Sequence, residues 1–299
     1  MSSDCLSPWR VSLHGGHSGE FCDHGDGTLE DVVRAAVAVG CPVYGLTEHA
    51  PRVESRFLFA EEREMGWDVP YLEDLFARYA RRMDALAAEY ADRIVLLKGF
   101  EVEVVPKSRY VEIMTGLRRE HNFEYIVGSV HYVDEVIIDY TQAEFDRAVA
   151  RCGGLEALAV RYYETVAEMV VALRPEIVGH FDLVRKQAPD EASVSTPRVR
   201  VAACAALDTV RDCGGILDVN TSGYRRGLGR PYPAPWIVEA ARARGIPFAF
   251  GDDSHRPSEV GAGINDVREY LLSLGVTEIA VLARGRAGLE HRAVSLLDD

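Results

Sequence analysis

Histidine and glutamate side chains recur at one position in this sequence, directly after short β-rich segments. The residues that end these segments are His14, His49, Glu101, His131, His180 and His255. Imidazole and carboxylate groups are typical ligands of Zn²⁺, Mn²⁺ and Fe²⁺, and ligand type alone does not choose among these ions. A tetrahedral zinc ion takes four donors, fewer than the sequence supplies. The pattern therefore predicts a site for more than one divalent metal ion.

Further histidines lie close to these segment ends. His17 and His24 follow His14 in the same loop, so that only His121 and His291 of the nine histidines fall outside the pattern. A single histidine of this kind is more often a hydrogen-bonded core residue. Histidines that recur at the ends of successive predicted strands favour metal binding instead.

Acidic residues flank the predicted ligands. In extended backbone, Asp253 and His255 would point to the same face, which leaves Asp252 pointing away as a loop or capping carboxylate. Glu103 is expected either in solvent or behind a ligand. Glu48 is equally compatible with orienting a ligand imidazole and with a solvated loop position.

The elements that must position these residues alternate between β-rich runs and amphipathic helical patterns. Strands are expected at 10–13, 42–47, 94–100, 125–130, 176–179, 215–219 and 246–251, with a weaker one at 278–282. Helices are expected from Thr28, where TLED is typical of a capping box, and at 71–92, 155–173, 197–213 and 233–245. This alternation predicts parallel strands joined by crossover helices. Seven or eight such units in an unbroken chain favour a closed barrel, whose strand ends converge on one mouth.

Composition narrows the class of protein. The 299 residues carry 33 Lys and Arg against 47 Asp and Glu, a net charge of −14, which disfavours nucleic acid as a partner. No run of about 20 apolar residues and no signal-peptide pattern is present, so we expect no membrane partner and a cytoplasmic location. No linker divides the chain, and a single domain over 1–299 is expected.

The cysteines favour reduced thiols. The six residues are widely spread and include no CxxC pair, which is typical of a reducing compartment. Cys22 lies between His17 and His24. It could contact a metal, although packing behind the loop is the expected role.

Seven motifs are distinctive when taken together and in order. They are HSGEFCDHG (17–25), GLTEHAP (45–51), GFEVE (99–103), GSVHYV (128–133), GHFDLVRK (179–186), LDVNTSGYRRGLGRPYP (217–233) and GDDSHRP (251–257). This set resembles the motifs of histidinol phosphatases of the polymerase and histidinol phosphatase (PHP) superfamily, over about residues 12–262. The resemblance implies an α/β fold, a distorted (β/α)₇ TIM-like barrel with a trinuclear metal centre. It also implies hydrolysis of L-histidinol phosphate to L-histidinol and phosphate, a step of histidine biosynthesis.

The same resemblance implies a set of metal ligands. Carried across motif by motif, they are His17, His24, His49, Glu101, His131, His180, Asp253 and His255. The chain departs from the family after the first strand, where the family has HxH and this sequence has LHGGH. Gly15 takes the place of the first histidine, and His14 is displaced by one residue. A bulge or left-handed turn at Gly15 and Gly16 would let His14 reach the metal, and we expect His14 to be a ligand.

Phosphate ester hydrolysis sets further requirements. It needs a nucleophile and neutralisation of charge on the phosphoryl oxygens, and two or three divalent ions (Zn, Mn or Fe) would supply a metal-bound hydroxide. Arg185 is the first candidate phosphate clamp and Arg225 the second, with a solvated loop as the alternative for Arg225. Lys186 is expected to be a surface charge. Glu20 and Tyr132 are candidates for contacting the amine and imidazole of histidinol.

Two other functions stay open from the sequence. A phosphoesterase of the same family could act on a different small phosphate monoester, because the metals do the chemistry and only loops choose the substrate. A catalytically silent metal-binding module is the second alternative, and Gly15 in place of a histidine is the feature that favours it.

Overall fold

A curled parallel sheet forms the centre of the computed structural model, which describes residues 7–286 and 288–298. Its strands lie in the order β1 (Val43–Leu46), β2 (Val95–Glu101), β3 (Tyr125–Gly128), β6 (Ile177–Val178), β7 (Ile216–Asn220) and β8 (Phe248–Gly251). Every neighbouring pair is parallel. Because the spatial order follows the chain order, each crossover moves to the next strand in the same direction, as in a barrel.

Residues 10–13 join the two edges of this sheet. Ser12 forms an isolated parallel bridge with Tyr44 of β1, and the Leu13 amide donates a hydrogen bond to the Phe250 carbonyl of β8 at 2.8 Å. The predicted distorted (β/α)₇ barrel is therefore confirmed. The segment forms a bridge rather than the regular strand predicted, because the chain bends immediately before two glycines.

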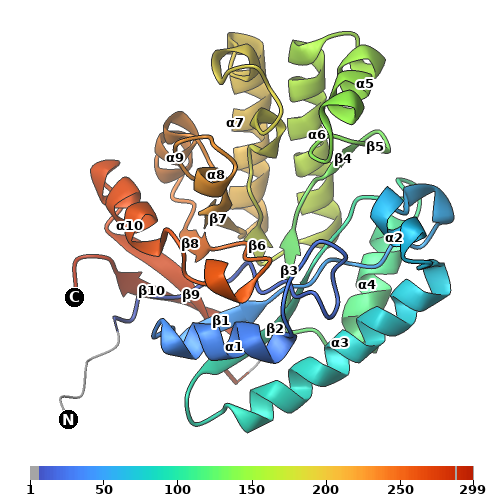
Figure 1. Ribbon diagram of the computed structural model, residues 1–299. Helices are drawn as coiled ribbons and strands as arrows, with labels where there is room; N and C mark the ends of the chain where they lie inside the picture. Colours follow the sequence, from blue (N-terminus) through green and yellow to red (C-terminus); the bar gives the residue numbers. More distant parts are fainter. Residues whose placement is uncertain (1–6, 287, 299) are drawn as a thin grey trace.

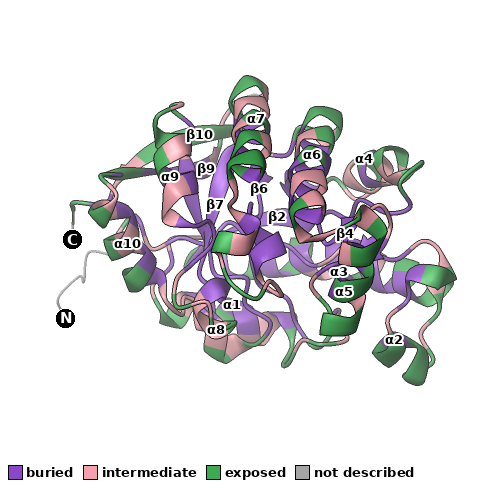
Figure 2. Ribbon diagram, turned by 90° about the horizontal axis from the view of Figure 1, so that it is seen from above, coloured by how far each residue is buried: buried purple, intermediate pink, exposed green. Residues whose placement is uncertain are grey.

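Helices surround the sheet on its outer side (Figure 1). They are α1 (Leu29–Ala38), α2 (Ala60–Glu64), α3 (Val69–Glu89), α4 (Tyr110–Glu120), α5 (Gln142–Cys152), α6 (Leu155–Leu173), α7 (Pro197–Cys213), α8 (Ser222–Arg225), α9 (Pro235–Arg242) and α10 (Ile264–Ser273). Short 3₁₀ turns are η1 (Ser55–Phe57), η2 (Leu183–Arg185), η3 (Ala192–Val194) and η4 (Pro257–Glu259). Figure 2 shows buried strands at the centre and exposed outward faces on α6 and α7. No helix in the described part of the chain is long and apolar enough to cross a membrane.

Local sequence signals fix several helix ends. The Thr28 side chain accepts a hydrogen bond from the Asp31 amide, and the Asp31 carboxylate accepts one from the Thr28 amide, which is the predicted capping box. Helix α7 begins at Pro197 after its cap Thr196 and ends before Gly214, whose φ of 75° is left-handed. Helices α6 and α7 span the segments predicted for them.

The last predicted strand lies outside the barrel sheet. β9 (Glu278–Arg284) pairs antiparallel with β10 (Leu289–Ser295), so the strand expected at 278–282 belongs to a separate hairpin. Ala280 and Leu282 of β9 pack in one apolar cluster with the first residues of β3, β6 and β7. The hairpin therefore covers the amino-terminal end of the barrel, opposite the strand ends that carry the predicted ligands. A smaller hairpin, β4 (Tyr132–Val133) with β5 (Val136–Ile137), follows β3.

The described cysteines are free thiols, in keeping with the expectation from the sequence. They are Cys22, Cys41, Cys152, Cys204 and Cys213. Cys5 lies outside the described residues.

Candidate metal centre

The carboxyl ends of the parallel strands bring the predicted ligands together. Glu101 is the last residue of β2, His49 and His131 follow β1 and β3 by three residues, and His180 follows β6 by two. The loop after β8 carries His255. Residues far apart in the sequence thus face one another because parallel strands end at the same rim of the barrel.

Glu101 lies at the centre of this cluster and is 1% exposed. Its Oε1 atom lies 3.2 Å from His14 Nε2, 3.4 Å from His131 Nε2 and 3.1 Å from His180 Nε2. Its Oε2 atom lies 2.9 Å from His49 Nδ1. Each carboxylate oxygen therefore has its own set of imidazole nitrogens, the arrangement expected of a carboxylate that bridges two cations.

Overlapping groups of side chains place their ligand atoms within 4.8 Å of one another. Three of these groups cover most of the cluster: Cys22, His24, His49 and His255; His14, His17 and Glu101; and Glu101, His131 and His180. Asp253 joins two further groups, one with His14 and His180 and one with His17 and His255. The structure thus brings all the predicted ligands into one connected cluster.

Several ring nitrogens of this cluster are buried without a hydrogen-bond partner among residues 7–286 and 288–298. They belong to His14, His17, His49 and His180. Buried polar atoms are almost always satisfied, and an unpartnered one in a folded protein calls for an explanation such as a bound ion. Imidazole nitrogens and a buried carboxylate are donors that divalent metals accept. The donor set therefore fits divalent metal ions.

His14 reaches the cluster although it is displaced in the sequence. Gly16, with φ of +77°, takes a left-handed conformation that turns the loop just after His14. On the far side of the ring, His14 Nδ1 lies 2.7 Å from Asp218 Oδ2, and the same oxygen accepts a hydrogen bond from Asn220 Nδ2 at 2.9 Å. The buried Asp218 carboxylate thereby holds the ring with Nε2 directed toward Glu101.

Two further carboxylates lie behind imidazoles of the cluster. Glu103 Oε1 lies 3.0 Å from His131 Nδ1. Glu48 accepts hydrogen bonds from the amide and hydroxyl of Ser18 at 2.8 and 2.9 Å, and its other oxygen lies 3.5 Å from His17 Nδ1. Of the alternatives left open by the sequence, the structure selects an orienting position for both acids.

Asp252 has the capping role predicted for it. Its carboxylate accepts hydrogen bonds from the Ser254 amide at 3.1 Å and the Gly261 amide at 2.9 Å, and from the Tyr44 hydroxyl. Asp253 nevertheless has φ of +48° and is not extended, so the strand alternation predicted for Asp253 and His255 was wrong.

Charges in the cluster shift the titration of its members. Burial alone would raise the pKa of Glu101, but His14, His131 and His49 hold that pKa well below its usual range. Burial would lower the pKa of His131, but Glu103 and Glu101 raise it to about 10. Without metal, the cluster therefore contains an ionised Glu101 carboxylate and a protonated His131 imidazole, so a metal ion that binds His131 must displace its proton.

A pocket of about 260 Å³ opens over the cluster. Its walls include the aromatic rings of Phe59, Tyr140 and Tyr232, the cationic side chains of Arg52, Lys186 and Arg226, and the carboxylates of Asp23, Glu61 and Asp139. Lys186 Nζ lies 3.1 Å from Asp139 Oδ2. Lys186 is therefore a pocket residue and not the surface charge predicted.

Arg185 does not line this pocket, contrary to its predicted role as a phosphate clamp. Its Nε atom lies 2.9 Å from Asp182 Oδ2, and the side chain is 4% exposed. The guanidinium also donates to the Pro231 carbonyl and lies over the Tyr232 ring, 4.8 Å from its centroid. Because its donors are used inside the protein, Arg185 holds η2 against the loop that precedes α9.

Arg225 also has an internal role. Its guanidinium donates to the backbone carbonyls of Asp252 and Asp253, and it does not line the pocket. It supports the loop that carries Asp253. The neighbouring Arg226 is exposed, lines the pocket and forms no ion pair within the described residues.

The two residues predicted to contact histidinol lie elsewhere. Glu20 is exposed, and its carboxylate accepts a hydrogen bond from the Leu29 amide at the start of α1. Tyr132 is buried against Phe57, with ring centroids 5.7 Å apart, and does not line the pocket.

Several residues of the site were not predicted from the sequence. Asp218 could have been found, because it lies two residues before Asn220 at the end of β7 and alternation puts both on one face. Phe59 lies between η1 and α2 and Tyr140 between β5 and α5, and neither residue carries such a signal. Their rings stack at 5.1 Å between centroids, an approach that only the tertiary structure shows.

Comparison with known proteins agrees with this geometry. The family model that matches is the PHP domain, over residues 13–222. A protein of Schizosaccharomyces pombe named probable histidinol-phosphatase is 32% identical over 286 residues, covering 93% of this chain and 91% of its own length. The histidinol-phosphatase of Saccharomyces cerevisiae is 27% identical over 295 residues, covering 87% of this chain and 88% of its own length.

A solved structure has the same fold. It is the histidinol phosphate phosphatase of Lactococcus lactis in complex with zinc, L-histidinol and phosphate, with a TM-score of 0.68 at 18% identity. The match covers 91% of this chain and 96% of the other.

Proposed function

The chain belongs to the PHP domain family, and from that premise we propose that it hydrolyses L-histidinol phosphate to L-histidinol and phosphate. The relatives named histidinol-phosphatase, which match nearly the whole chain, support this activity. The observation that carries the proposal is the Glu101 carboxylate, with imidazole nitrogens at 3.1 to 3.4 Å from one oxygen and at 2.9 Å from the other. This hydrolysis is a step of histidine biosynthesis.

The proposed cofactors are two or three divalent metal ions, Zn, Mn or Fe. The proposed ligands are His14, His17, His24, His49, Glu101, His131, His180, Asp253 and His255. When bound, such ions lower the pKa of a water molecule toward neutrality and neutralise the charge on phosphoryl oxygens. The outer carboxylates of Asp218, Glu103 and Glu48 would orient three of the imidazoles.

The residues of the pocket suit the two ends of this substrate. Arg226, which forms no ion pair with any described residue, takes over the role of phosphate clamp from Arg185. The carboxylates of Asp23, Glu61 and Asp139 would attract the cationic amine of histidinol, and Phe59 and Tyr140 would pack against its imidazole. Lys186, which is paired with Asp139, would partly neutralise the negative charge of these carboxylates.

The substrate is tested by phosphate release from L-histidinol phosphate beside a panel of other small phosphate monoesters, with Mn²⁺ or Zn²⁺ supplied. We expect a kcat/KM for L-histidinol phosphate at least roughly tenfold above any other ester, since the acidic and aromatic walls contact only the histidinol part. An equal or higher kcat/KM for a monoester without an amine would show that the pocket serves another substrate.

The silent-module alternative loses its support in the structure. It rested on Gly15 in place of a histidine. His14 Nε2 nevertheless lies 3.2 Å from Glu101 Oε1, so the displaced histidine places a donor nitrogen within the cluster.

A further inference from the structure

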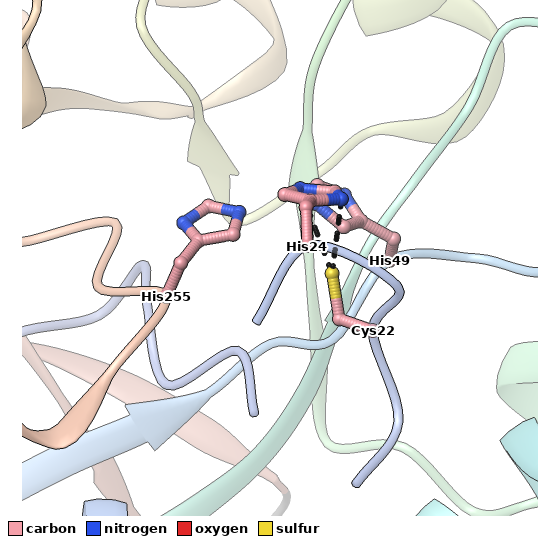
Figure 3. A group of neighbouring side chains, drawn as sticks. All are labelled: Cys22, His24, His49 and His255. Carbon is pink, nitrogen blue, oxygen red and sulfur yellow. Dashed lines mark hydrogen bonds between the residues drawn. The ribbon is translucent and has the colours of Figure 1, made fainter. Parts of the chain in front are cut away.

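Cys22 lies with three of the proposed ligands, His24, His49 and His255 (Figure 3). Its Sγ atom is 3.3 Å from His24 Nδ1 and 3.5 Å from His24 Nε2. The ligand atoms of all four side chains lie within 4.8 Å of one another. Cys22 is 6% exposed, so its thiol faces the cluster and not bulk solvent.

The separation between Cys22 and His24 suits two donors on one ion. With Zn–S near 2.3 Å and Zn–N near 2.0–2.1 Å, a tetrahedral ion sets sulfur and nitrogen about 3.5 Å apart. His49 Nδ1 lies 2.9 Å from Glu101 Oε2, and His49 Nε2 is buried without a hydrogen-bond partner among the described residues. The histidine that would complete the group with Cys22 is therefore available for a ligand.

The backbone holds Cys22 in this place. The Cys22 amide donates to the Ser18 carbonyl at 2.8 Å, and the Gly25 amide donates back to the Cys22 carbonyl at 3.3 Å. The Asp26 amide donates to the His255 carbonyl at 2.8 Å. The loop that carries Cys22 and His24 is thus tied directly to the loop that carries His255.

We propose that the Cys22 thiolate is the fourth ligand of the metal position formed by His24, His49 and His255. The inference rests on the proposed metal centre and adds a sulfur donor to it. On metal binding, the thiol gives its proton to solvent and the sulfur lone pair binds the ion. Among residues 7–286 and 288–298, the candidate groups around Glu101 contain only nitrogen and oxygen donors.

This ligand gives the metal positions different preferences. A soft thiolate favours Zn²⁺ over Mn²⁺, whereas imidazole and carboxylate accept both. A position with four protein ligands is closed, while one with fewer keeps room for water or substrate. The Cys22 position would therefore retain zinc, and exchange with other metals would occur around Glu101.

The test is the absorption spectrum of the full-length protein reconstituted with Co²⁺. A cobalt–thiolate bond gives an intense near-ultraviolet charge-transfer band that nitrogen and oxygen ligands do not give. We expect the band in the wild type and in Cys41→Ser, a control at a buried cysteine outside every candidate metal group. Cys22→Ser and Cys22→Ala should lose the band. Loss of a residue that only hydrogen-bonds a metal ligand lowers metal affinity roughly 10- to 100-fold. Loss of a direct ligand should lower the zinc affinity of this position by at least as much.

The outcomes separate this proposal from the metal centre itself. Cobalt binding without the band in the wild type, or a band that survives in folded Cys22→Ala, would show that Cys22 is not a ligand while the centre stands. A wild type that binds no cobalt would overturn the metal centre, and the thiolate ligand with it. Even if the variants fail to fold, a cobalt-bound wild type without the band would show that Cys22 is not a ligand.

Discussion

Single residues show where the strand-end rule succeeds and where it fails. The rule selected Glu101 and the histidines around it, because parallel strands must end at one rim. It says nothing about which way a loop side chain turns. Arg185 follows His180 by five residues, yet its guanidinium turns to Asp182, the residue directly before the same 3₁₀ turn. The short separation of this Asp–Arg pair was the one signal in the sequence against a free clamp.

Replacement of His14 by alanine tests the displaced ligand. His14→Ala removes a nitrogen that lies 3.2 Å from Glu101 Oε1, and we expect the loss of about one bound metal ion and a fall in kcat of roughly 100-fold or more. Metal content by elemental analysis and the rate of phosphate release check this. His121→Ala, outside the cluster, is the matched control. Unchanged metal content and turnover in His14→Ala would remove His14 from the centre.

Arg226 and Arg230 provide a matched pair for the phosphate contact. Arg226 lines the pocket without an ion pair to any described residue, whereas Arg230 lies 3.4 Å from Glu191. We expect Arg226→Ala to lower kcat/KM by roughly 10- to 100-fold, the size of one charge-assisted hydrogen bond, with metal content intact. Arg230→Ala should change kcat/KM less than twofold. Equal kinetics for the two variants would mean that Arg226 does not bind phosphate.

Arg185 is expected to act on stability. Arg185→Ala would leave the Asp182 carboxylate, 2% exposed, without its cation. Breaking a buried ion pair in this way costs about 3–5 kcal/mol, and the free energy of unfolding in urea measures the loss. A variant as stable as the wild type, with a large fall in kcat/KM, would instead show that Arg185 binds the phosphate group.

At the scale of elements, regular structure with a strong local signal could be predicted and short structure could not. The capping box at Thr28 and the long amphipathic patterns of α6 and α7 identified those helices. The hairpin of β4 with β5 has two residues in each strand, too few for any periodicity. The pairing of β9 with β10 depends on contacts across the barrel end, which one sequence does not display.

Gly16 tests the turn that places His14. Its φ is +77°, and a Cβ there would lie 2.3 Å from Leu46 Cδ2. Gly66 is the matched control, with φ of +72° and nothing within 4 Å of an added Cβ. Both alanine variants carry the left-handed strain of about 1 kcal/mol, but only Gly16→Ala meets a buried side chain. We expect a lower Tm and lower metal content for Gly16→Ala than for Gly66→Ala, and equal values for both would show that the turn tolerates a side chain.

At the scale of the whole molecule, the net charge of −14 has to be reconciled with a phosphate substrate. Without metal, the cluster and its pocket contain many carboxylates and would repel a phosphate ester. Bound divalent ions would reverse the local field, because an ion at a site outweighs more distant surface charges. The barrel brings the proposed ligands to one rim, and the hairpin of β9 and β10 covers the opposite end.

The central claim is a metal-dependent phosphatase acting on L-histidinol phosphate. The most direct measurement is phosphate release from this ester by the same preparation as purified, after chelation, and after Mn²⁺ or Zn²⁺ is restored. We expect turnover to fall by at least roughly 100-fold on chelation and to return with the metal. Turnover that survives complete removal of metal, or no turnover with any divalent ion, would contradict it.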